Sequence, residues 1–86
     1  MGTWEPNGGY GFRRSYVRKL EGLDRIRVYV DFEQWDDEDA PLEYQWQVSD
    51  GSCGRKLDYG SVDGDAGLAA AMAVADAAAA RLFPGH

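Results

Sequence analysis

Apolar and polar residues alternate along two segments in the middle of the chain. In residues 25–35, positions 26, 28, 30 and 32 are apolar, and the odd-numbered positions are charged or aromatic. Residues 42–49 have the same period of two. Such alternation, rich in β-branched and aromatic residues, is typical of half-buried β-strands. The apolar positions of the two strands give the predicted sheet core: Ile26, Val28, Val30, Phe32, Leu42, Tyr44, Trp46 and Val48.

Two weaker strand patterns flank this pair. The first covers residues 10–20, where two arginines share a parity with Tyr16 and Leu20, so their aliphatic stems are expected to lie along one sheet face. The second covers residues 53–59, although glycines at its ends weaken it. Turn-forming residues separate all these segments. The sequence therefore predicts three to four antiparallel strands.

The C-terminal part of the chain predicts a helix over residues 65–83. Ten of these residues are alanine, which is the best helix former. Asp63 or Asp65 is the expected N-cap, and a Pro-Gly pair ends the run. The helix is expected to cover the sheet with the face formed by Leu68, Met72, Ala75, Ala79 and Leu82.

These elements predict an α+β fold, in which a single antiparallel sheet packs one face against the C-terminal helix. Residues 1–9, rich in glycine, are expected to form a flexible N-terminal arm, and residues 10–86 a single domain. One helix covers one sheet face, which leaves the other face to solvent or to a partner. The uncovered residues would be Arg25, Arg27, Tyr29, Trp35, Gln45 and Gln47.

The formal charge of −6 is distributed unevenly along the chain. Residues 1–30 carry a net charge of +3, and residues 31–86 carry −9. The densest block, residues 31–43, holds seven acids and no base. Two interpretations are open: a solvated hairpin loop that keeps a small protein soluble, or a surface that imitates the charge of a nucleic-acid backbone and occupies a basic groove.

Cysteine and histidine are too few for several kinds of site. Cys53 is the only cysteine, which excludes an intrachain disulfide and a cysteine-cluster zinc site. The absence of cysteine pairs favours a cytoplasmic location. We expect the Cys53 side chain to be half-buried beside a turn. The only histidine, His86, is the last residue, so histidine-based catalysis has no base. The acidic block lacks the spacing of a calcium loop. We expect no enzyme activity, no catalytic residue, no metal and no cofactor.

The chain also lacks the patterns of membrane and secreted proteins. No apolar run reaches the length of a membrane span, and the first residues do not resemble a signal peptide. A basic and aromatic stretch begins at Arg13 and ends at Arg27. It is either a single-stranded nucleic-acid binding surface or an edge strand that charge protects from aggregation, and the acidic composition favours the second.

One resemblance covers residues 25–83. The run Tyr44-Gln45-Trp46-Gln47-Val48, the pair Asp50-Gly51, and the Asp-Gly-Asp start of an alanine-rich helix resemble small acidic phage and prophage accessory proteins, including some anti-CRISPR proteins. The resemblance implies a protein that acts by binding and blocking, often on a nucleic-acid-handling machine. It assigns no role to any residue of this chain.

The leading hypothesis is a non-enzymatic inhibitor. Its expected partner is a protein with a basic surface, such as a CRISPR–Cas effector. The expected contact residues are Asp31, Glu33, Trp35, Asp36, Asp37, Glu38 and Asp39. A secondary interface would use Arg25, Arg27 and Tyr29. The alternative is a structural or assembly module that forms a homodimer through the uncovered sheet face. A third hypothesis is single-stranded nucleic-acid binding through the basic stretch.

Overall fold

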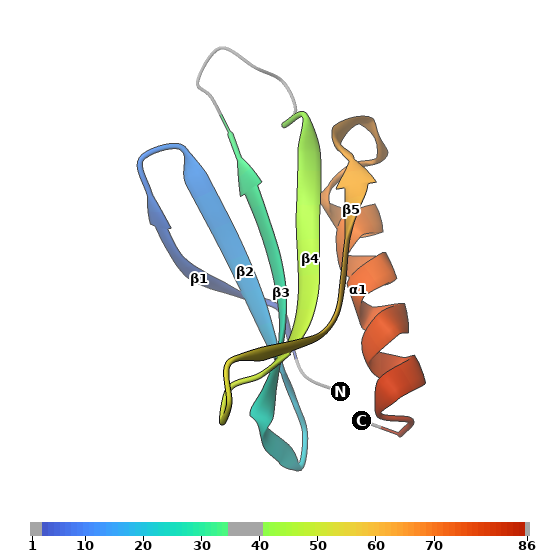
Figure 1. Ribbon diagram of the computed structural model, residues 1–86. Coiled ribbons are helices and arrows are strands. Elements are labelled where there is room, and N and C mark those ends of the chain that lie inside the picture. The colour runs from blue at the N-terminus through green and yellow to red at the C-terminus, as the bar shows by residue number, and fades with distance from the viewer. Residues whose placement is uncertain (1–2, 35–40, 86) are drawn as a thin grey trace.

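The described chain folds into one antiparallel sheet and one helix (Figure 1). The computed structural model describes residues 3–34 and 41–85. In chain order the elements are β1 (Glu5–Tyr10), β2 (Arg13–Leu20), β3 (Leu23–Glu33), β4 (Glu43–Asp50), β5 (Arg55–Asp63), the 3₁₀ turn η1 (Gly64–Ala66) and α1 (Leu68–Leu82). Each strand pairs with its neighbours in the chain, so the sheet is a meander. The predicted α+β class, with one antiparallel sheet and a C-terminal helix, is confirmed.

The strand number differs from the prediction of three to four, since the sheet has five within the described residues. The additional strand is β1, which lies in the segment expected to form an N-terminal arm. Gly11 has a φ of 65°, and the chain reverses there, which divides the strand predicted over residues 10–20. Pro6 is tolerated because β1 is an edge strand, and the register with β2 shifts between Pro6 and Gly9.

The two alternating segments form β3 and β4 and supply the core, as predicted. Ile26, Val28, Val30 and Val48 are fully buried, and β3 and β4 pair in the register that places Val28 opposite Val48. Two predicted core residues differ. Leu42 is 89% exposed because it precedes β4 and lies outside the strand pairing. Phe32 is half-buried near the end of β3, between Tyr16 and Tyr44.

The helix lies against β3, β4 and β5 (Figure 1). Its buried residues are all alanines, whose small side chains let the helix backbone approach the sheet closely: Ala71, Ala75, Ala78 and Ala79. The predicted face was therefore placed slightly wrongly. Leu82 is 41% exposed, whereas Leu68 and Met72 are half-buried against the core. No helix in the described ranges is long and apolar enough to cross a membrane.

The helix also begins later than predicted. Its N-cap is Gly67, with a φ of 91° and no side-chain cap, so neither predicted aspartate caps α1. Asp63 instead accepts a hydrogen bond from the backbone N–H of Asp65 and caps η1. A short 3₁₀ turn therefore occupies the segment in which the first helical turn was expected.

The last strand is β5, which extends beyond the predicted segment at residues 53–59. Within this strand, Gly60 lies opposite Trp46 on β4. A Cβ atom at Gly60 would lie 2.8 Å from the indole ring of Trp46. Glycine in this strand therefore makes room for a large core side chain and does not end the strand.

Candidate protein-binding face

The face of the sheet opposite α1 carries polar and aromatic residues. Successive strand residues point to opposite faces, and residues paired across strands share a face. Since Val28 and Val30 are buried with the helix, Tyr29 between them belongs to the other side, which we call the open face. Its four rows are Lys19, Arg27, Ser49 and Lys56; Val17, Tyr29, Gln47 and Tyr59; Ser15, Asp31, Gln45 and Ser61; and the pairs Arg13–Glu33 and Glu43–Asp63.

Carboxylates gather at one end of the open face, where β3 ends and β4 begins. This acidic end consists of Asp31, Glu33, Glu43 and Asp63. A hollow of about 410 Å³ lies there, lined by Arg13, Asp31, Phe32, Glu33, Leu42, Glu43 and Gln45. Three carboxylates and the highly exposed side chain of Leu42 thus border one concave surface. Such a surface is complementary to a cationic side chain with an aliphatic stem, such as arginine or lysine.

Two of the seven predicted contact residues lie at this acidic end. Asp31 is half-buried and pairs with Ser15 and Gln45 across the neighbouring strands, and Glu33 is exposed. Trp35, Asp36, Asp37, Glu38 and Asp39 lie outside the described residues. Glu43 and Asp63 were not among the predicted contacts. The alternation of β4 indicated the side of Glu43, but the place of Asp63 required the pairing of β4 with β5.

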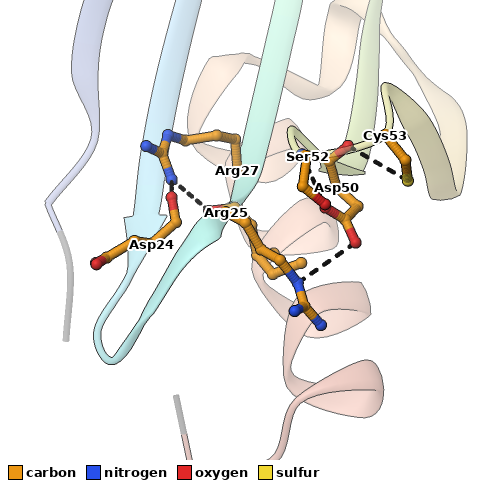
Figure 2. A network of polar contacts seen from close by, with 7 residues as sticks. Asp24, Arg25, Arg27, Asp50, Ser52 and Cys53 are labelled. Carbon is orange, nitrogen blue, oxygen red and sulfur yellow. Dashed lines mark hydrogen bonds and ion pairs between the residues drawn. The ribbon is translucent and has the colours of Figure 1, made fainter.

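Basic residues gather at the opposite end of the open face. This basic end consists of Lys19, Arg27 and Lys56. Figure 2 shows that Arg27 folds back and donates to the backbone carbonyl oxygen of Asp24 near the start of β3. The Nζ atom of Lys56 lies 5.7 Å from the ring centre of Tyr59, within the range of a cation–π contact.

The three residues of the predicted secondary interface do not lie together on one surface. Arg25 lies beside the β4–β5 turn, where its Nε is 3.4 Å from Asp50 Oδ2 (Figure 2). Arg27 belongs to the basic end, and Tyr29 is half-buried at the centre of the open face. The structure therefore places Arg27 and Tyr29 together on the open face and gives Arg25 a role in the turn.

Asp50 organises the turn that joins β4 to β5. Its Oδ1 accepts hydrogen bonds from the hydroxyl of Ser52 at 2.7 Å and from the backbone N–H of Ser52 at 3.0 Å (Figure 2). These two bonds, assisted by the charge of Arg25, hold the pKa of the Asp50 carboxyl below its usual range and outweigh the opposing effect of desolvation. Cys53 in the same turn is exposed, which corrects the expectation of a half-buried thiol.

Sequence reasoning missed one cluster on the helix side of the sheet. Arg18 is 5% exposed, and its Nε lies 2.6 Å from Asp76 Oδ1 of α1. The indole Nε1 of Trp4 donates to the other oxygen of Asp76 at 3.3 Å. The sequence held a signal, because Asp76 is the one acid within the alanine-rich helix, but the partners of that acid depend on the tertiary structure.

The described residues contain no group of three or more histidine, cysteine, aspartate or glutamate side chains that could hold a metal ion. What the open face offers is charge, hydrogen-bonding side chains and exposed apolar area. Comparison of the chain with family models, with curated proteins and with solved structures finds no match in any of the three.

Proposed function

We propose that this protein is a non-enzymatic binding protein whose acidic end occupies a basic, nucleic-acid-binding site on another protein. The observation that supports this most is the hollow at the acidic end. There Asp31, Glu33 and Glu43 border the same concave surface, next to exposed Leu42. The carboxylates would attract arginine and lysine over several ångströms, and the apolar border would contact their stems.

The charge of this surface supports a partner that ordinarily binds nucleic acid. Basic grooves that hold a phosphate backbone attract any surface with closely spaced negative charge. A CRISPR–Cas effector is the first partner to test, in keeping with the resemblance to small phage proteins. The protein would then act as a competitor that excludes nucleic acid from the groove.

The test is capture of partners from nuclease-treated lysate of the native host by the immobilised protein. The variant Glu33→Lys/Glu43→Lys reverses two exposed carboxylates at the acidic end. We expect a nucleic-acid-binding protein to be captured by the wild type at about 0.1 M salt and released at about 0.5 M salt, because screening weakens exposed charge pairs. Capture by the variant should fall at least roughly tenfold.

The matched control is Glu5→Lys/Asp24→Lys, which makes the same change in net charge at exposed positions away from the acidic end. It should capture the partner as well as the wild type does, and the captured partner should lose its binding of labelled nucleic acid when wild-type protein is added. Equal loss of capture in both variants would show an effect of net charge alone and would refute the proposal.

A further inference from the structure

The charges of the open face are sorted along the strands. Lys19, Arg27 and Lys56 lie in the row nearest the β2–β3 and β4–β5 turns. The row at the other end holds three carboxylates and one arginine, in the pairs Arg13–Glu33 and Glu43–Asp63. Between these rows lie Tyr29, which is half-buried, and Tyr59, which is 69% exposed. The open face therefore has a basic end, an aromatic and polar centre, and an acidic end.

We infer that the open face binds a second copy of this chain, face to face and with the strands of the two copies antiparallel. A two-fold axis between two stacked sheets can run along the strands or across them. An axis along the strands would place each basic end on the other basic end. An axis across the strands places each basic end on the acidic end of its partner, so charge selects this arrangement.

The axis across the strands stacks each strand on its own copy, reversed. Arg27 then meets the partner's Glu33 on β3, and Lys56 meets the partner's Asp63 on β5, and each pair occurs twice by symmetry. On β2 the arrangement places Lys19 near the partner's Arg13, which is an unfavourable contact between like charges. Glu33 lies opposite Arg13 in the pairing of β2 with β3, so its carboxylate reduces this repulsion. At the centre, Tyr29 lies near the partner's Asp31, whose carboxylate can accept from a phenol.

The size of the face predicts a weak dimer. Four strands about 4.8 Å apart, followed over about 20 Å of their length, present roughly 400 Å² per copy. Two such faces would bury about 800 Å² in total, below the roughly 1,200 Å² at which stable specific interfaces begin, so the association should be weak and transient. The dimer should therefore be sought at concentrations of about 100 µM or more.

The test is a charge exchange followed by sedimentation equilibrium. Arg27→Glu places Glu opposite Glu33 in a homodimer, and Glu33→Arg places Arg opposite Arg27, so each variant alone should be monomeric where the wild type is dimeric. An equal mixture of the two variants restores both opposite-charge pairs and should sediment as a heterodimer. Arg81→Glu is the control on the helix, and it should dimerise as the wild type does.

Several outcomes would overturn the inference: a monomeric wild type at about 300 µM, dimers that survive in either single variant, or a mixture that stays monomeric. If Arg27→Glu unfolds through loss of its hydrogen bonds to the carbonyls of Asp24 and Ile26, Tyr59→Glu at the exposed centre replaces it. A dimer retained by that variant would count equally against the face. Arg27→Glu leaves the acidic end intact, so it should still capture the basic partner. The two proposals can therefore fail separately.

Discussion

Among the individual residues, Arg18 is charged and almost completely buried. Arg18 lies under α1 with its guanidinium beside Asp76, and its Nη1 is buried without a hydrogen-bond partner among the described residues. A buried charge that loses its counter-ion is costly, whereas an ion pair replaced by apolar residues of similar size is often tolerated. This difference allows the contribution of the pair to be tested.

Asp76→Ala should lower the free energy of unfolding by roughly 2–3 kcal/mol, because it leaves Arg18 buried beside no carboxylate. The double variant Arg18→Met/Asp76→Ala should recover most of that loss, because the methionine side chain fills the same space without a charge. Urea denaturation followed by tryptophan fluorescence measures both. If the double variant is less stable than Asp76→Ala, the prediction is wrong, because the loss in Asp76→Ala would then not come from the unpaired charge of Arg18.

Asp50 gives a prediction on pH. Its pKa is lowered in the folded protein, mainly by the two hydrogen bonds from Ser52, so its contribution to stability is complete above the ordinary carboxyl pKa of about 3.9 and is lost as the pH falls through its folded-state pKa. Asp50→Asn should therefore be less stable than the wild type at pH 7, and the difference should shrink in acid below that range. Thermal melts of both proteins, at pH values from about 2 to about 7, measure this difference in stability.

Ser52→Ala is the companion variant, since it removes the hydroxyl that supplies the first of these hydrogen bonds. It should lose stability in the same pH range but by a smaller amount, because the backbone N–H of residue 52 still donates. A loss in Asp50→Asn that stays constant from neutral pH to strong acid would contradict the assignment.

Among the elements, β5 leaves room for the indole ring of Trp46 on β4 because Gly60 has no side chain. Gly60→Ala would place a Cβ 2.8 Å from the ring of Trp46, which is 8% exposed in the core. We expect the variant to lose roughly 1–3 kcal/mol, since an overpacked core must shift side chains or backbone. Ser61→Ala, next in the strand and on the open face, should change stability little, and differential scanning calorimetry compares the two.

In the molecule as a whole, the two faces of the sheet differ in what covers them. The alanine-rich helix covers one face and packs closely against it, because its buried side chains are small. The other face keeps its charged residues, sorted into a basic and an acidic end. Because the proposed partner and the proposed second copy both use Glu33, they exclude one another. We therefore expect binding of the proposed basic partner to dissociate the proposed dimer.

Local patterns along the chain were enough to predict the fold class and the clearest strands. Period-two alternation identified β3 and β4, and alanine content identified the helix, because both signals depend only on neighbours along the chain. The same alternation placed Tyr29 and Arg27 on the uncovered side. It also placed Asp31 and Glu33 there, where the structure finds the acidic end.

Features that depend on pairing between distant segments could be seen only in the folded chain. A strand such as β1, with Pro6 and two glycines, has little strand propensity, and it forms because β2 offers an unpaired edge. The partners of Arg18, the room that Gly60 leaves for Trp46 and the place of Asp63 beside Glu43 are likewise contacts across the sheet or between sheet and helix. No local pattern encodes them, because register and packing are properties of the assembled layers.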